Sequence, residues 1–239
     1  MKTKVILSLL LFTTILGFSQ ININQIGNSI NKAVTGSKSL SNDDIVKGLK
    51  EALSLGSKHA SDSASKKDGY FKNPKIKIPL PKDVKQAEST LRSMGMGSTV
   101  DNFVMAMNRA AEDAAKKSTP IFVNAVTSMT ISDGLQILKG ADTAATSYLR
   151  KTTYTPLKTE FKPVIKSAIA KAEVTKYYKP LVTKYNKIPF VKKLNPNLDE
   201  YITDRALSGL FYLVSQEEIK IRKDPAARVT DILKKVFGN

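Results

Sequence analysis

The sequence contains no cysteine and no tryptophan, and it has a single histidine among its 239 residues. Without cysteine the chain cannot form a disulfide, a cysteine-ligated zinc or iron–sulfur site, or a thiol nucleophile. A Ser/His/Asp triad or a histidine-rich metal site would depend on His59 alone. His59 lies in a run of small polar residues, so we expect an exposed side chain that is neither a base nor a ligand. The Glu-x-x-His pattern of di-iron bundles is missing too, because Gly56 stands three residues before His59. We therefore expect no metal site and no cofactor.

Acidic residues are scarce relative to basic ones. The chain has 38 Lys and Arg against 21 Asp and Glu, which gives a formal net charge of +17. It is 41% hydrophobic and 25% charged. This composition is typical of neither a disordered chain nor an integral membrane protein, because disorder requires less apolar content and a span requires a long uncharged run. The length suits one globular domain, or at most two.

The first 19 residues have the pattern of a secretory signal peptide. Lys2 and Lys4 precede a short apolar run over residues 6–18, and the small residues Gly17 and Ser19 fit a cleavage site after Ser19. A transmembrane anchor is the alternative, but the run is shorter than the approximately 20 residues that a span needs. Without cysteine near the cut, a lipoprotein is excluded. We expect a soluble periplasmic or secreted protein with no transmembrane segment in the mature chain.

The mature chain divides into a leader and a helical region. Residues 20–40 lack a sustained period and predict a flexible leader. From Ser41 and Asp44, which supply a helix cap, apolar residues recur at helical spacing, and glycine, proline and capping residues mark the ends of the segments. The expected helices span about residues 41–62, 82–94, 98–117, 120–129, 132–139, 142–152, 156–172, 175–187, 199–222 and 225–237.

Two kinds of proline-containing segment interrupt this pattern. Residues 69–81 contain three prolines and alternating Lys and Ile, so we expect an extended segment, which is the only plausible strand. Pro163 and Pro180 lie inside expected helices and should kink or break them. We predict an all-α fold: a single multi-helix, bundle-like domain over residues 41–238, with one short extended proline-rich segment at about 69–81.

One-sided apolar stripes predict which helix faces form the core. The run from 206 to 214 is apolar all round, so its helix should lie in the middle of the bundle, where Gly209 would permit a close approach. The three stripes are Val100, Phe103, Val104, Met107, Ala111 and Ala114; Leu157, Phe161, Val164, Ile165, Ala168 and Ile169; and Val229, Ile232, Leu233, Val236 and Phe237.

Several longer motifs resemble one known family. They are GLKEALSLG at 48–56, NPKIKIPLP at 73–81, MNRAAEDAA at 107–115, DGLQILKGADTAATSYLRKTT at 133–153 and RALSGLFYLVSQEEIKIRKDPAARVTDILKKVFG at 205–238. In this order they resemble the bacterial family called domain of unknown function 4197, from about residue 40 to the end. The resemblance implies an exported, all-helical envelope protein, and it brings no activity and no catalytic residues.

Basic residues are concentrated between Arg150 and Lys193, where 12 Lys and Arg face only two glutamates. Aromatic residues, including Tyr185 and Phe190, are interleaved with them. Such helices bind anionic lipid headgroups, acidic glycans or nucleic acid. Nucleic acid is not expected, because export separates the chain from the genome and no nucleic-acid motif is present. The alternative is a solvated face that only keeps the protein soluble, which the scarcity of Arg favours. The candidate anion-binding face consists of Lys158, Lys162, Lys166, Lys176, Lys179, Lys184 and Lys187.

Methionines are clustered as well. Flexible thioethers line adaptable apolar grooves, so the cluster predicts a pocket for an acyl chain or another amphiphile, although filling of the core is the commoner use. The candidate apolar pocket consists of Met94, Met96, Met105, Met107 and Met129.

A third candidate site is polar. Carboxylates beside Asn and Arg can perform acid–base chemistry, but the spacing of Arg109 and Glu112 is also that of an ordinary ion pair on a helix. No residue supplies a nucleophile or a metal. Glu217 and Glu218 fit an exposed face. The candidate polar residues are Asn108, Arg109, Glu112, Asp142 and Arg150.

These observations favour a non-catalytic envelope protein that binds an anionic or amphiphilic component. Two alternatives stay open: a hydrolase that uses carboxylates such as Glu112, and a structural protein that binds a protein partner. An enzyme requires polar side chains that converge in a water-accessible cleft, whereas a partner-binding protein requires an exposed apolar patch.

Overall fold

The computed structural model describes residues 41–171, 174–191, 193–194 and 198–227 and positions 234 and 236. The predicted signal peptide and leader lie outside these residues. The predicted apolar stripe that begins at Val229 lies almost entirely outside them, because only position 236 of that stripe is described.

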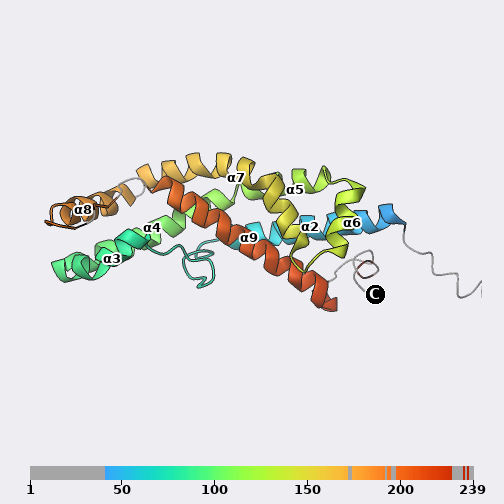
Figure 1. Cartoon of the computed structure of the whole chain (residues 1–239), viewed down its shortest axis with the longest axis horizontal. Coiled ribbons are helices and arrows are strands. Elements are labelled where there is room, and N and C mark those ends of the chain that lie inside the picture. The colour runs from blue at the N-terminus through green and yellow to red at the C-terminus, as the bar shows by residue number, and fades with distance from the viewer. Residues whose placement is uncertain are drawn as a thin grey trace, which may run out of the picture. The chain divides into compact units, whose positions relative to one another are not determined.

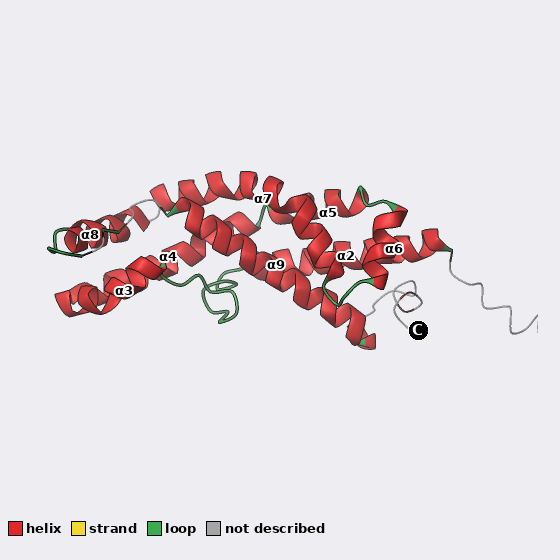
Figure 2. Cartoon of the chain, in the orientation of Figure 1, coloured by secondary structure: helices red, strands yellow, loops and turns green. Residues whose placement is uncertain are grey.

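The described part of the chain is helical and contains no strand, which confirms the predicted all-α fold (Figure 2). A single turn of π-helix, η1 (Arg92–Met96), joins α3 to α4, and a 3-10 turn, η2 (Pro225–Ala227), follows α9. The α-helices are α2 (Asn42–Ser65), α3 (Lys82–Leu91), α4 (Gly97–Ala115), α5 (Ser118–Thr127), α6 (Ile131–Lys139), α7 (Ala144–Lys171), α8 (Val174–Asn186) and α9 (Asp199–Lys223).

Helix α2 begins at the cap that the sequence predicts. The Ser41 hydroxyl accepts a hydrogen bond from the backbone N–H of Asp44 at 3.1 Å, and the Asp44 carboxylate accepts the Ser41 N–H at 3.3 Å. Thr130 and Asp133 form the same reciprocal pair at the start of α6. Each pair satisfies two backbone groups that a helix start would otherwise leave without a partner.

Helix α7 is continuous, and the prediction of two helices at 142–152 and 156–172 is wrong. It runs through residues 153–155 and past Pro156 and Pro163, and α8 likewise continues past Pro180. An internal proline costs about 3 kcal/mol. On α7, however, the side chains of Leu149, Leu157, Phe161 and Ile165 are fully buried, and burial of one such side chain contributes about 1.5–3 kcal/mol. Tertiary packing therefore outweighs the local cost of the prolines.

Helix α9 packs against α2, α4 and α7, as the apolar run at 206–214 predicts (Figure 1). The first two predicted stripes both face the core: in the α4 stripe only Val104 is partly buried rather than buried, and in the α7 stripe Val164, Ala168 and Ile169 are. The core therefore lies between α9 and the α4 and α7 stripes.

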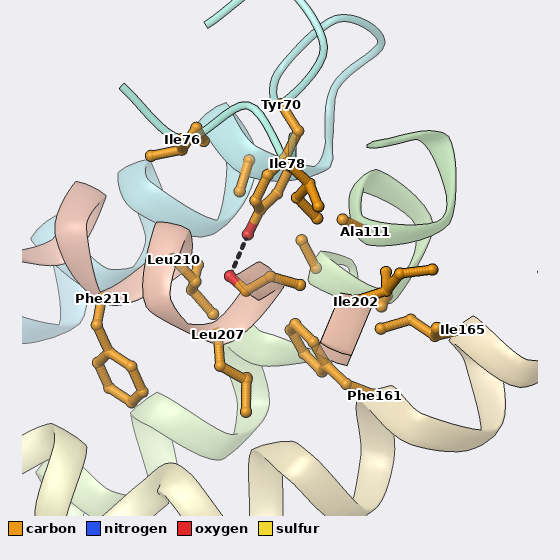
Figure 3. Close-up of a cluster of buried hydrophobic side chains, with 14 of the residues drawn as sticks. Tyr70, Ile76, Ile78, Ala111, Phe161, Ile165, Ile202, Leu207, Leu210 and Phe211 are labelled. Atoms are coloured by element: carbon orange, nitrogen blue, oxygen red, sulfur yellow. Dashed lines mark hydrogen bonds between the residues drawn. The ribbon is translucent and has the colours of Figure 1, made fainter. Parts of the chain in front are cut away.

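The segment between α2 and α3, residues 66–81, lies across α4 and α9, and we call it the strap. It is made of turns and extended backbone but is not a strand (Figure 2). Its buried side chains Tyr70, Ile76 and Ile78 enter the core beside Leu207 and Leu210 of α9 (Figure 3). A Cβ added to Gly209 would lie 2.9 Å from Cε1 of Tyr70. The close approach predicted at Gly209 is therefore made by side chains of the strap.

No single one of the described helices combines the length and the apolar character of a transmembrane helix. Only α5 and α6 taken together meet this criterion, and the two are bent by 103° relative to each other.

Candidate functional site

Glu112, from the predicted polar site, lies in the interior, where it binds the strap. Its side chain on α4 is only 4% exposed. One carboxylate oxygen accepts the backbone N–H groups of Tyr70 and Phe71, both at 3.1 Å. The other oxygen accepts a hydrogen bond from the Arg109 guanidinium at 2.6 Å. These three hydrogen bonds connect α4 to the beginning of the strap.

Asn108, one residue before Arg109, binds the end of the strap. Its side-chain oxygen accepts the N–H of Ile78 at 2.8 Å, and its side-chain nitrogen donates to the Ile78 carbonyl at 3.0 Å. The buried amide thus replaces the neighbouring strand that an extended peptide would otherwise require. This pairing explains why the segment predicted as a strand is extended without belonging to a sheet.

Arg109 joins two acidic groups. Its guanidinium contacts Asp68 of the strap at 2.6 Å as well as Glu112. Hydrogen bonds from Lys72 and Arg109 hold the pKa of Asp68 below its usual value. Asp68 has a left-handed backbone, with φ of 69°, which Asp tolerates better than most residues. The ion pairs therefore fix a turn that has unusual backbone geometry.

The far side of the strap is bound by two tyrosines. The buried Tyr70 hydroxyl donates to the Ala206 carbonyl of α9 at 2.7 Å (Figure 3), and its burial raises the pKa of Tyr70 far above its usual range. The Tyr201 hydroxyl of α9 donates to the Pro79 carbonyl at 2.9 Å. Polar groups on α4 and α9 therefore secure the strap at both of its ends.

The other two predicted polar residues lie elsewhere. Asp142 pairs with Lys223 at 2.5 Å, and this contact lowers the pKa of Asp142. The Arg150 guanidinium lies over the ring of Phe211, 4.7 Å from its centroid. The five residues therefore do not converge in one cleft, and Asn108, Arg109 and Glu112 already have partners within the fold. This arrangement favours the structural interpretation of these residues over the catalytic one.

Glu218, expected on an exposed face, is buried, so that expectation is wrong. Its carboxylate accepts the N–H groups of Ala145 and Thr146 at 2.9 and 2.8 Å, at the start of α7, and it also contacts Arg222. The negative charge lies where the first turn of α7 presents free donors and the positive end of the helix dipole. Neighbouring Glu217 lies 3.5 Å from the exposed ring of His59. Adjacent glutamates give no sequence signal that one of them is buried.

The predicted methionine pocket does not form a common surface. Met107 and Met129 are buried in the core, whereas Met94 and Met105 are exposed, and Met96 is partly buried. Two of the five side chains are therefore enclosed by the core, while two face solvent. The placement of Met107 and Met129 favours core filling.

An open groove of about 380 Å³ lies instead between α5 and α7. It is lined by Ile121, Asn124, Ala125, Ser128, Tyr148, Thr152, Thr153 and Pro156. None of these side chains is charged, and none is a methionine. The groove therefore involves neither the predicted polar residues nor the predicted pocket.

The predicted lysine face consists of two different parts. Lys158 contacts Glu200 and Asp204 of α9, and Lys162 contacts Glu200 at 3.0 Å. Hydrogen bonds to Glu200 raise the pKa of both lysines, and the same contacts lower the pKa of Glu200. These two lysines bind α7 to α9, so their charge is largely neutralised within the domain.

The remaining lysines of this face point into solvent. Lys166 near the end of α7, and Lys179 and Lys184 on α8, are exposed, and so is Lys187 just after α8. Among the residues that the structure describes, no carboxylate lies within ion-pair distance of any of the four. The side chain of Lys176 lies outside the described residues. Leu181 and Val182 on the same helix are buried, so α8 has an apolar inner face and a basic outer face.

We call residues 174–194 the basic segment. It comprises α8 and most of the loop that follows, and it contains six lysines and no acidic residue. Helix α8 packs on α3, α4 and α7. No group of three His, Asp or Glu side chains within the described ranges is placed to hold a metal ion.

The fold and these sites define an all-helical domain in which buried carboxylates bind the protein's own backbone and one segment, residues 174–194, contains lysines but no acidic residue. Over residues 39–238 the chain matches a family described as "Protein of unknown function (DUF4197)", and it belongs to that family. This match confirms the resemblance that the sequence motifs indicate. No curated protein and no solved structure gives a significant match to the chain.

Proposed function

We propose that this protein is an exported, non-catalytic envelope protein that binds an anionic surface through the basic segment. The observation that carries the proposal is the contrast within one row of lysines. Lys158 and Lys162 are paired by Glu200, whereas Lys179, Lys184 and Lys187 are exposed and have no acidic partner among the residues that the structure describes. Within the described part of the fold, these last three charges form no ion pair.

The expected strength of this interaction follows from the charge. Each lysine near an anionic surface contributes about 1 kcal/mol. Six lysines would therefore give a dissociation constant of roughly tens of micromolar. Such binding is reversible and falls as salt screens the charges. Lipid headgroups and acidic glycans both present suitable anions, and export through the predicted signal peptide would bring the protein to them.

A hydrolase is not favoured by the geometry. Glu112, the carboxylate named for that role, already accepts three hydrogen bonds inside the fold. A structural protein that binds a protein partner would need an exposed apolar patch. The large exposed apolar residues in the described part of the chain lie on different elements instead: Met94 on η1, Met105 on α4, Val123 on α5, Ile131 on α6 and Phe190 in the loop after α8. The basic segment is therefore the surface that best supports a binding function.

The test is co-sedimentation with vesicles of phosphatidylcholine, with and without phosphatidylglycerol, at low and high salt. We expect binding only to the anionic vesicles and its loss at high salt. The variant Lys179→Gln/Lys184→Gln/Lys187→Gln should weaken binding about a hundredfold, since it removes three contributions of about 1 kcal/mol each.

A second triple variant, Lys47→Gln/Lys67→Gln/Lys139→Gln, is the matched control. It removes the same net charge from exposed positions on α2, in the strap and on α6. It should retain most of the affinity. Equal losses in the two variants would show that binding follows net charge rather than the basic segment and would contradict the proposal.

A further inference from the structure

The loop that follows α8 holds an aromatic side chain in water. Phe190 has a relative exposure of 107%, so its ring makes almost no contact with the rest of the domain. Its backbone is left-handed, with φ of 64°, a conformation that is unfavourable for a bulky side chain. The other described non-glycine residue with positive φ is Asp68, which Arg109 and Lys72 hold in place. Among the described residues, no such contact holds Phe190 in place.

The two ends of this loop are tied together. The side-chain oxygen of Asn186 accepts the N–H of Leu194 at 2.8 Å, and its side-chain nitrogen donates to the Leu194 carbonyl at 3.3 Å. The Leu194 side chain is buried. The Lys193 ammonium donates to the Asn186 carbonyl, near the negative end of α8. These contacts close the base of the loop, and Phe190 projects between its two ends.

The surroundings of the loop select one kind of partner. Lys184, Lys187 and Lys193 are exposed on either side of Phe190, and no acidic residue occurs anywhere in the basic segment. An exposed apolar ring with exposed lysines on both sides of it along the chain matches a surface that carries negative charge outside and an apolar phase beneath it. An acidic glycan supplies the charge but no apolar interior for the ring. An anionic lipid bilayer supplies both.

We propose that Phe190 inserts into the interfacial region of an anionic lipid bilayer while the neighbouring lysines contact the headgroups. This inference rests on the proposed function and names lipid as the anionic partner. Insertion removes the ring from water, which is the burial that the fold does not provide. The closed base of the loop would favour insertion, because a ring that is already held in position loses less conformational freedom on binding.

The absence of tryptophan from the chain makes a direct test available. In Phe190→Trp the only indole in the protein reports on this loop. On addition of phosphatidylglycerol vesicles we expect its emission to shift to the blue and to be quenched by lipids brominated in their acyl chains. The matched control is Ile131→Trp, at a position on α6 that is 48% exposed. Its emission should not change.

A second variant separates insertion from charge. Phe190→Ser should weaken binding to phosphatidylglycerol vesicles about tenfold, the loss expected when one buried apolar side chain is removed. It should leave binding to heparin, a soluble acidic polysaccharide, unchanged. Its melting temperature should equal that of the wild type because Phe190 contributes no packing, and this comparison verifies the fold.

The possible failures are distinguishable. Salt-sensitive binding to anionic vesicles without a blue shift in Phe190→Trp would overturn the insertion and leave the charge-based function standing. Equal losses of vesicle and heparin binding in Phe190→Ser would also overturn it. If the wild-type protein bound heparin but not anionic vesicles, the insertion would be wrong and the charge-based function would stand. Binding to neither would overturn both.

Discussion

Glu112 and Lys184 are both charged residues on helices, yet the fold treats them in opposite ways. The Glu112 carboxylate is buried, and it accepts hydrogen bonds from the N–H groups of Tyr70 and Phe71 and from the Arg109 guanidinium. The Lys184 side chain on α8 is exposed and has no acidic partner among the described residues. The same difference separates the strap contacts from Lys179 and Lys187 of the basic segment, which are likewise exposed without an acidic partner among the described residues.

This contrast shows which charges are available for function. Burial of an ionised group without partners is costly, so a buried carboxylate that already has a full set of donors serves the structure. An exposed lysine costs little and contributes little to stability when it has no partner. A cluster of such lysines, together with an exposed aromatic ring, is therefore better explained by an external partner than by folding. The predictions below would break or sharpen this division.

The largest effect is expected at Glu112. Glu112→Ala leaves the N–H groups of Tyr70 and Phe71 without their acceptor and removes one partner of Arg109. Loss of one member of a buried ion pair costs about 3–5 kcal/mol, so the free energy of unfolding should fall by about 3 kcal/mol in urea titrations. Asp113→Ala, at an exposed neighbour whose one ion pair among the described residues is with Lys116, should change it by less than about 0.5 kcal/mol.

If Glu112→Ala were as stable as Asp113→Ala, the carboxylate would not be holding the strap. The distinction between charges that stabilise the fold and charges that are available for binding would then be contradicted at Glu112. Vesicle binding by the folded fraction of Glu112→Ala should equal that of the wild type.

A smaller loss of stability is expected for Gly209→Ala, and Gly56→Ala serves as the matched control. A Cβ at this position would lie 2.9 Å from Tyr70 and 3.0 Å from Ile76, and Tyr70 cannot move easily because its hydroxyl is bound to Ala206. Overpacking costs about 1–3 kcal/mol, which opposes a helix-propensity gain of about 1 kcal/mol. At Gly56 on α2 the closest atom would be 3.4 Å away. Gly56→Ala should therefore be stabilised by most of the approximately 1 kcal/mol by which alanine exceeds glycine in helix propensity.

We therefore expect Gly209→Ala to be about 2 kcal/mol less stable than Gly56→Ala, as measured by chemical unfolding of both variants. Equal stabilities would mean that the strap can lift away from α9. In that case it could not be described as a fixed part of the core.

Much of this architecture follows from local pattern. The sequence predicts the cap at Ser41, the stripes on α4 and α7 and the central position of α9, because helical periodicity indicates which face is buried. It does not predict the continuity of α7. Pro156 is a local signal for a helix end, and only the burial of Leu149, Leu157 and Phe161 against other elements overrides it.

The sites show a similar limit. The sequence identifies Asn108, Arg109 and Glu112 as a cluster because they are close along α4, but their partners Asp68, Tyr70 and Ile78 lie about 30 to 42 positions away. Spacing along one helix cannot reveal what crosses it. For the same reason, the division of the lysine row depends on Glu200, which lies 38 positions from Lys162.

The smallest effect is expected in the pH dependence of stability, and it compares the two parts of the lysine row directly. Lys158 and Lys162 lower the pKa of Glu200 below its ordinary value of 4.5. A depressed carboxylate pKa means that the folded state favours the ionised form. The stabilisation is therefore complete above about pH 4.5 and is lost as the pH falls through the lowered pKa.

Glu200→Gln should accordingly be slightly less stable than the wild type at neutral pH, and the difference should disappear as the pH is lowered below 4.5, the ordinary pKa of this group. Urea unfolding measured from neutral to acidic pH tests this expectation. The triple variant Lys179→Gln/Lys184→Gln/Lys187→Gln should keep the wild-type dependence in this range, since no described carboxylate pairs with these lysines. If the free energy of unfolding of the triple variant changed less between neutral and acidic pH than that of the wild type, the basic segment would have a carboxylate partner. Its charges would then stabilise the fold rather than remain available to an external partner.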